Sequence, residues 1–350
     1  MESKIPVGIL GATGAVGQRF VQILADHPWF EIASLAASER SAGRPYGEAC
    51  HFILPGDVPD RIREMPVLPL EPGIPGKIVF SALPADVARE VEPRFAAAGY
   101  AVCSNASAFR NEPDVPLIIP EVNPDHLALI PEQRKNRGFP GFIVTNPNCS
   151  TTGIAMALKP LDDAFGVEKV IAFTMQAVSG AGYPGVPALD IIGNVLPYIP
   201  GEEEKIAREA RLLLGRVESE AQVPADFQVS AHANRVPVID GHTICLSIGF
   251  RDPPAVEEAM DVLRAFRAPA PVRELPSAPV HPLALRPEVD RPQPRKDRDA
   301  ERGMVVTVGR VRPCSILDLR MVVLVHNTLR GAAGGAVLNG ELLIAKGFVS

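Results

Sequence analysis

One cysteine stands in a setting that suits nucleophilic chemistry. Cys149 lies within Asn146-Pro147-Asn148-Cys149-Ser150-Thr151-Thr152, between a strand-type run, 141–144, and an apolar helical run, 154–158. The hydroxyl residues after it are typical helix caps. A helix N-terminus lowers a thiol pKa and presents N–H groups to a developing oxyanion. The pattern predicts a catalytic thiol; the alternative is a small buried structural residue.

A glycine-rich loop near the N-terminus has the form of a dinucleotide site. It follows a strand, 7–10, and precedes a helical run, 18–26. Its sequence is Gly11-Ala12-Thr13-Gly14-Ala15-Val16-Gly17, spaced G-x-x-G-x-x-G instead of the better-known G-x-G-x-x-G. Glycine lets the backbone turn tightly and approach a pyrophosphate, which sits on the helix N-terminus. The alternative is a glycine loop without a ligand.

The end of the second strand, 31–36, bears on which cofactor is bound. Glu39 stands where an acid would hold the ribose hydroxyls of NAD. Ser38, Arg40 and Ser41 suit the 2′-phosphate of NADP instead. We therefore predict NADP; the alternative is a charged loop with Glu39 and Arg40 in water.

Strands and helices alternate up to Cys149. Strand 77–83 leads into a helix, 84–98, and then into strand 100–103. This alternation predicts a parallel sheet with helices on both faces, whose ligands bind at the carboxyl ends of the strands. Arg110 follows such an end and is a candidate anion ligand. With 27 arginines in the chain, a solvated side chain is the simpler interpretation.

The second half carries further candidates. A long strand, 170–178, holds Gln176 and runs into a glycine-rich segment, 179–185. A helix predicted at 201–216 places Glu202 and Lys205 on one face. Their alternative is a surface ion pair of little energetic value.

A predicted hairpin brings two more polar residues together. Strand 228–238 carries Arg235, Asp240-Gly241 turns the chain, and strand 242–250 begins with His242. Both residues flank one bend, although a lone histidine is more often structural than catalytic.

The rest of the pattern fixes the predicted architecture. We expect a helix at 255–266, a long surface excursion at 268–303, strands at 304–309 and 316–326, and a C-terminal helix to about residue 346. The fold class is therefore α/β. We predict a Rossmann-type parallel-sheet nucleotide domain at 1–149. A second, α+β domain at 150–326 is predicted to have a mixed or antiparallel sheet with helices on one face.

Composition excludes several classes of protein. The net charge of -6 argues against nucleic-acid binding, and no apolar run is long enough to suggest a membrane span. We expect no signal peptide. The five scattered cysteines lack metal spacing, so we expect no metal and a reducing, cytoplasmic location.

Together these motifs resemble the aspartate-β-semialdehyde dehydrogenase family, in its archaeal and fungal branch, over nearly the whole chain. Besides the glycine loop and the cysteine motif, the resemblance rests on four segments, Ser38 to Gly43, Gln176 to Gly182, Arg235 to His242 and Asn327 to Gly334. It implies reduction of L-4-aspartyl phosphate to L-aspartate 4-semialdehyde by NADPH, in biosynthesis of lysine, threonine, methionine and isoleucine. It also implies that 327–350 completes the nucleotide domain, that 150–326 is the catalytic and dimerisation domain, and that the protein is a homodimer or homotetramer.

The resemblance also implies a role for each matching residue. Cys149 is the nucleophile, His242 the acid/base, and Gln176 orients the acyl group. The implied substrate ligands are Arg235 for the α-carboxylate, Glu202 for the amino group, and Lys205, Arg110 and Asn111 for phosphate. The implied cofactor ligands are Gly11, Thr13, Gly14, Ala15, Val16, Ser38, Arg40, Ser41, Ser81, Ser179, Gly180 and Asn327.

Two rival functions stay open at this point. A malonyl-CoA or succinyl-CoA reductase of the same architecture would keep the cysteine and the cofactor loop, yet need no amino-acid or phosphate ligands. A nucleotide-sensing binding protein that has lost catalysis would not need Cys149 and His242.

Overall fold

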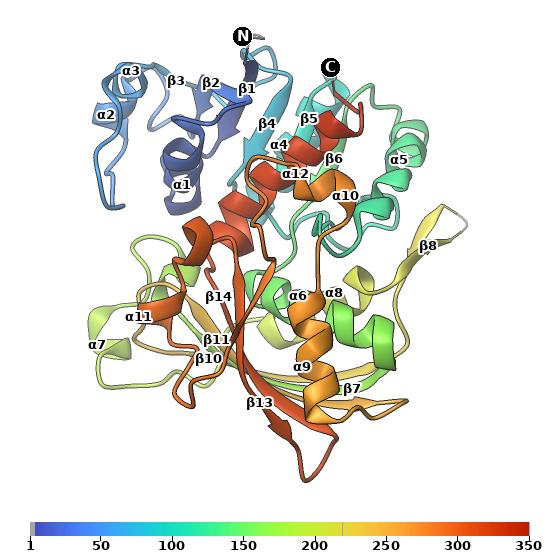
Figure 1. Ribbon diagram of the computed structural model, residues 1–350. Helices are drawn as coiled ribbons and strands as arrows, with labels where there is room; N and C mark the ends of the chain where they lie inside the picture. Colours follow the sequence, from blue (N-terminus) through green and yellow to red (C-terminus); the bar gives the residue numbers. More distant parts are fainter. Residues whose placement is uncertain (1–3, 219, 350) are drawn as a thin grey trace.

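The computed structural model describes residues 4–218 and 220–349, which form two main sheets with their helices. Figure 1 shows the first sheet at the top and the second below it. The first sheet is wholly parallel, in the order β3-β2-β1-β4-β5-β6. Its strands are β1 (Ile5–Leu10), β2 (Phe30–Ala36), β3 (Val67–Leu68), β4 (Ile78–Ser81), β5 (Ala101–Ser104) and β6 (Phe142–Thr145).

Helices cover this sheet as the alternation predicted. They are α1 (Ala15–Leu24), α2 (Tyr46–Ala49), α3 (Asp60–Arg63), α4 (Ala85–Ala97) and α5 (Ile130–Arg137). The last helix of the chain, α12 (Gly334–Ala345), returns to the same sheet, where Leu338 and Leu342 join the core of Phe20, Phe30 and Phe80. Because an apolar helix needs such a surface, the chain's end completes the first sheet's core.

The second sheet is mixed, in the order β10-β7-β11-β14-β13-β12. Its strands are β7 (Val167–Gln176), β10 (Gln228–Arg235), β11 (His242–Phe250), β12 (Leu283–Arg286), β13 (Val306–Pro313) and β14 (Leu319–Val325), and a separate ribbon pairs β8 (Arg216–Glu218) with β9 (Ala221–Val223). The predicted fold class, a parallel sheet plus a mixed one, is confirmed.

The predicted hairpin of the strands before and after Asp240-Gly241 is wrong. β7 lies between them, parallel to β10 and antiparallel to β11. The surface excursion predicted at 268–303 contains regular elements for which no prediction was made. It contains α10 (Ala270–Arg273), α11 (Pro294–Asp297) and the edge strand β12, which pairs in parallel with β13.

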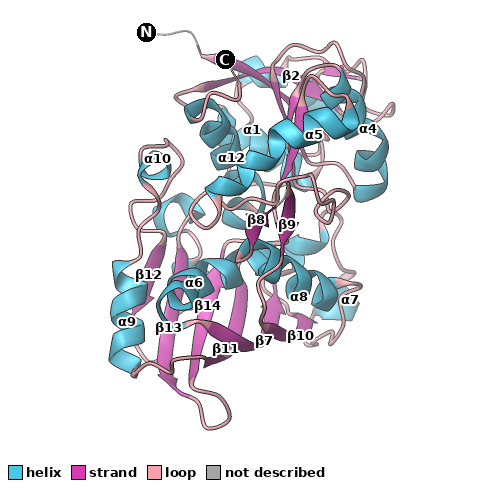
Figure 2. Ribbon diagram, turned by 90° about the vertical axis from the view of Figure 1, so that its right-hand side faces the viewer, coloured by secondary structure: helices cyan, strands magenta, loops and turns pink. Residues whose placement is uncertain are grey.

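Three helices cover one face of the second sheet, as Figure 2 shows. They are α6 (Cys149–Phe165), α8 (Glu202–Leu213) and α9 (Val256–Ala265), and their apolar residues form one core with the strands. The short α7 (Ala188–Ile191) lies outside this layer. Phe173, on the other face, is 46% exposed. No helix within the described residues is long and apolar enough to cross a membrane.

Candidate active site

Cys149 is the first residue of α6, immediately after β6, as the motif predicted. The helix cap is Asn148, whose Oδ1 accepts the N–H groups of Ser150 and Thr151 at 2.9 and 3.1 Å. The prediction that Ser150 and the two threonines after it cap the helix is therefore wrong, because the capping side chain is that of Asn148, which precedes Cys149. Gly331 makes room here, because a Cβ on it would lie 2.7 Å from the Cys149 Cβ.

His242 faces the cysteine from the start of β11. Its Nε2 lies 3.1 Å from the Cys149 Sγ, and its Nδ1 accepts the backbone N–H of Ala177 at 3.0 Å. His242 is fully buried, whereas Cys149 keeps partial exposure. The two side chains that the sequence placed 93 residues apart thus form one contact.

Burial governs the ionisation of this pair. Desolvation raises the pKa of the Cys149 thiol to about 12; the charge of Glu202 raises it further, while Arg110 and Arg235 oppose the shift. The prediction of a lowered thiol pKa is wrong, because desolvation outweighs the effect of the helix N-terminus. Burial likewise lowers the pKa of His242 to about 3, with Arg235 and His326 adding to the effect.

Glu202 organises the polar groups beside the cysteine. One carboxylate oxygen accepts from the Asn148 Nδ2 at 2.7 Å and from the Gln176 Nε2 at 2.9 Å. Glu202 is 6% exposed and bonds to these two amides instead of to Lys205, so it does not form the surface ion pair that was the alternative. The structure brings Gln176 and Glu202 together at the Cys149 end of α6.

Arg235 closes the other side of the site. Its Nη1 donates to the Ala177 carbonyl at 2.9 Å, and the side chain is buried. Gly180 packs closely over it, because a Cβ there would lie 2.8 Å from the Arg235 Nη1 and 3.2 Å from the His242 Cε1. The glycine-rich segment after β7 thus makes room for both side chains.

The three predicted phosphate ligands differ in their surroundings. Arg110 is buried, donating through Nη1 to Glu209 at 3.2 Å and through Nη2 to the Asn105 carbonyl at 2.7 Å, while its Nε has no hydrogen-bond partner in the described part of the chain. The half-buried Lys205 has no ion-pair partner within the described residues. Asn111 instead accepts from Arg208 at the surface, at 2.5 Å.

Glu209 is a site residue that the sequence reasoning missed. It is 1% exposed, and its two oxygens accept from the Arg110 Nη1 at 3.2 Å and from the Asn148 backbone N–H at 2.5 Å. The signal was available. Glu209 is seven residues after Glu202, two helical turns along the face that carries Ile206 and Leu213, and an acid on an apolar face needs a partner.

The glycine loop leaves a helix N-terminus open. Gly11 has φ 78°, and the N-cap of α1, Gly14, makes no side-chain capping bond. Gly17 permits the tight turn, because a Cβ on it would lie 2.1 Å from the Gly11 carbonyl oxygen. The first N–H groups of α1 are therefore available to an anion, as a pyrophosphate requires.

The remaining predicted cofactor residues lie in two places. Ser38 and Arg40 are exposed after β2, next to the nearly buried Ser41, and Ser81 is fully buried at the end of β4. Asn327 donates to the Ser179 Oγ at 2.8 Å and accepts the Gly241 N–H at 2.9 Å. These two hydrogen bonds hold Asn327, which follows β14, beside the segment that contains Ser179 and Gly180.

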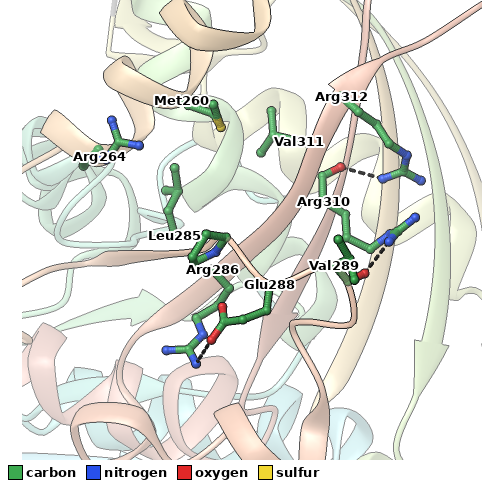
Figure 3. Close-up of a pocket in the computed structure, with 10 residues that line it drawn as sticks. Met260, Arg264, Leu285, Arg286, Glu288, Val289, Arg310, Val311 and Arg312 are labelled. Atoms are coloured by element: carbon green, nitrogen blue, oxygen red, sulfur yellow. Dashed lines mark hydrogen bonds and ion pairs between the residues drawn. The ribbon is translucent and has the colours of Figure 1, made fainter.

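A cavity of about 490 Å³ lies elsewhere, between α9 and strands β12 and β13. Figure 3 shows its lining, including Arg264, Arg286 and Met260. Arg286 pairs with Glu288, and Arg264 with Asp261. None of the predicted site residues lines this cavity, so it is not the candidate active site.

Comparisons with known proteins agree with this arrangement. Residues 6–130 match the family model described as semialdehyde dehydrogenase, NAD binding domain, and residues 158–330 match its dimerisation domain. Aspartate-semialdehyde dehydrogenases from Archaeoglobus fulgidus and Cryptococcus neoformans are 53% and 46% identical, over 97% and 99% of this chain and 98% of each relative. The crystal structure of the Candida albicans enzyme with NADP is similar with a TM-score of 0.92 and 43% identity, covering 99% of this chain and all of that one.

Proposed function

The chain belongs to the aspartate-semialdehyde dehydrogenase family, and from that membership we propose that it reduces L-4-aspartyl phosphate to L-aspartate 4-semialdehyde through a thioester on Cys149. The observation that carries the proposal is the 3.1 Å contact between the Cys149 Sγ and the His242 Nε2 at a capped helix N-terminus. The products would serve lysine, threonine, methionine and isoleucine biosynthesis. Five free cysteines suit a reducing compartment such as the cytoplasm.

Each charged group around Cys149 binds a different part of the substrate in this proposal. Arg235 offers a guanidinium to the α-carboxylate, and the carboxylate of Glu202 faces the amino group. Arg110 and Lys205 serve the phosphate, since the unpartnered Arg110 Nε and the unpaired Lys205 ammonium are both available to an anion. Gln176, held by Glu202, orients the acyl oxygen. Asn111 is the weakest assignment, because its side chain bonds to Arg208.

NADP fits the first sheet. The uncapped N-terminus of α1 receives the pyrophosphate, and the exposed Ser38 and Arg40 receive the 2′-phosphate. Bound NADPH supplies the hydride that reduces the acyl carbon. Asn327 and Ser179 hold the segment beside Cys149 and His242 in place for the nicotinamide side of the site. We propose accordingly a nucleotide domain of 1–149 with 327–350 and a catalytic domain of 150–326.

The second sheet supplies the proposed subunit contact. Residues 158–330 match a dimerisation domain, and the face opposite α6, α8 and α9 carries the half-exposed Phe173. We propose a homodimer, alone or paired into a tetramer, that joins through this face.

The deciding assay runs the reaction in reverse. Aspartate semialdehyde, phosphate and NADP should give NADPH absorbance, whereas malonyl-CoA with NADPH should give no oxidation. Cys149→Ala should abolish the first reaction while retaining NADPH binding, because only the nucleophile is lost. Brisk malonyl-CoA reduction, without phosphate-dependent oxidation of the semialdehyde, would establish the CoA-thioester reductase instead.

Substitution of Lys205 tests, in the same assay, whether the phosphate and the amino group of the substrate bind at separate sites. Lys205→Ala should raise KM for phosphate by at least about tenfold, since a charge-assisted contact to a desolvated anion is worth more than a surface pair. Glu202→Ala should instead weaken semialdehyde binding and leave KM for phosphate unchanged. Identical effects of the two substitutions would contradict separate phosphate and amino-group sites.

A further inference from the structure

A second cavity, of about 400 Å³, lies where the C-terminal end of α1 meets the start of α12. Leu329 and Gly334 contribute to its wall, whereas Gly331 between them packs against Cys149. None of the predicted site residues lines this cavity. Its volume lies within the range of small-molecule sites, roughly 300–1,000 Å³. The cavity is therefore a candidate ligand site that is separate from the candidate active site.

One wall of this cavity is a left-handed turn of the backbone. Glu301 and Arg302 have φ 42° and 61°, and Gly303 follows with φ 76°. Residues other than glycine disfavour this conformation, and backbone strain of this kind is common at ligand sites. Gly303 packs closely against the start of the π-helical turn Leu329–Ala333, because a Cβ on it would lie 2.6 Å from the Leu329 Cδ1. The strained turn thereby presents Arg302 and Met304 to the cavity.

Two opposite charges at the cavity lack charged partners. Asp26, which is exposed just after α1, makes no side-chain hydrogen bond or ion pair within the described residues. Arg302 donates through Nη2 to the Pro276 carbonyl at 3.1 Å and pairs with no carboxylate in the same part of the chain. One carboxylate and one guanidinium are therefore available to a ligand in the cavity.

Ser277 adds a hydroxyl donor at 9% exposure. Its Oγ lies 3.4 Å from the His27 Nε2, which lies 2.7 Å from the Glu341 Oε1. The His27 Nδ1 accepts the backbone N–H groups of Trp29 and Phe30, so the ring proton lies on Nε2. Because a protonated Nε2 cannot accept a hydrogen bond, the Ser277 hydroxyl proton has no acceptor among the residues that the structure describes and can be donated to a ligand.

We propose that this cavity binds a small zwitterion with an apolar body, which is the chemistry of a free α-amino acid with an aliphatic side chain. Asp26 receives the ammonium group, and Arg302 and Ser277 receive the carboxylate. The aliphatic side chain packs against Met304 and Leu329 in the wall of the cavity. The binding needs no catalysis, so it is independent of the proposed function.

Methyl NMR with L-leucine as the probe measures the binding. In protein labelled with ¹³C at the methionine and leucine methyl groups, L-leucine should shift the signals of Met304 and Leu329, which Met304→Leu and Leu329→Met assign. The analogues 4-methylpentanoate, 3-methylbutylamine and glycine lack the ammonium, the carboxylate and the apolar side chain in turn. Each should bind at least about tenfold more weakly than L-leucine. Absence of a shift at about 20 mM L-leucine, or equal binding of glycine, overturns the proposal.

Substitutions assign the binding to this cavity. Asp26→Asn and Arg302→Gln should each raise the Kd for L-leucine at least about fivefold, because each removes a charge-assisted contact at an exposed position. Asp57→Asn and Arg295→Gln are the matched controls and should leave the Kd unchanged, since both residues are exposed and lie outside the cavity. Arg235→Met, in the candidate active site, should also retain L-leucine binding. Loss of binding in Arg235→Met with unchanged binding in Asp26→Asn and Arg302→Gln would place L-leucine in the candidate active site and overturn the proposal.

Discussion

At the scale of single residues, nearby charges adjust the pKa of the Cys149 thiol, which burial raises most. Its thiol pKa of about 12 is raised by burial and by Glu202 and lowered by Arg110. Removing the negative charge in Glu202→Gln should therefore lower the pKa and speed iodoacetamide alkylation at pH 8. Arg110→Met should raise the pKa and slow alkylation, while Arg110→Lys should keep the rate nearer wild type.

Alkylation rates measured at several pH values also give the direction in which the reactivity of Cys149 changes with pH. A group with a raised pKa is mostly protonated at pH 8, so the wild-type rate should climb about tenfold per pH unit well below the pKa. A rate that is already independent of pH at pH 8 would show a thiolate in the resting protein. Equal shifts in Glu202→Gln and Arg110→Met would show that their charges do not act on the sulfur.

Arg40 is expected to select between cofactors at the residue scale. Its side chain is exposed after β2, beside Ser38. Arg40→Ala should raise KM for NADPH about ten- to a hundredfold and leave NADH nearly unaffected, because a charge-assisted phosphate contact is worth roughly 1.5–3 kcal/mol. Arg44→Ala is the matched control, since Arg44 donates to the Glu48 carbonyl. Equal losses with both cofactors would contradict a 2′-phosphate contact.

At the scale of elements, α8 holds the start of α6 in place through Glu209. The carboxylate bonds at once to Arg110 and to the Asn148 N–H. In Glu209→Gln one oxygen becomes a donor, so one of these bonds is lost. We expect kcat to fall roughly tenfold or more, since hydrogen bonds to charged groups are worth about 1.5–3 kcal/mol.

Glu204→Gln on the same helix is the control, because Glu204 is exposed. Steady-state kinetics and the urea midpoint should both be read for each variant. A loss of stability in Glu209→Gln with unchanged kcat would make Glu209 a packing residue alone.

Local sequence patterns predicted the individual helices and strands better than they predicted which strands pair in the sheet. The strand from His242 to Phe250 and the helix near 255–266 were predicted within a residue or two, because each has its own apolar period and turn signals. The hairpin was wrong since β7, 50 or more residues earlier, inserts between β10 and β11. β12 was missed because proline and charge surround its four residues.

The same distinction applies to the site. Cys149, His242 and Gln176 were predicted as site residues from motifs and from the family resemblance, but the direction of the thiol pKa shift depends on desolvation, which only the assembled fold creates. The Asn148 cap was adjacent to the cysteine in sequence, yet three hydroxyl residues competed with it for that role. Glu209 became visible once α8 and α6 were placed together.

At the scale of the whole molecule, the uncovered face of the second sheet is the proposed subunit contact. Phe173 on β7 is 46% exposed and stacks on His232 of the neighbouring β10, with ring centroids 4.7 Å apart. Aromatic residues are enriched at subunit contacts, and Phe173 lies in the range 158–330 that matches a dimerisation domain. Phe173→Glu should therefore bury an unpaired charge in the proposed interface and release monomers.

Light scattering after size-exclusion chromatography measures this release. Wild type should elute as a dimer or tetramer, and Phe173→Glu at micromolar concentration should elute as a monomer of 37.4 kDa. Val280→Glu is the control, because Val280 is 73% exposed on the loop before β12. The proposed pyrophosphate site at the N-terminus of α1 lies within a single chain, so the monomer should retain NADPH binding. An unchanged oligomer in Phe173→Glu would place the subunit contact on another surface.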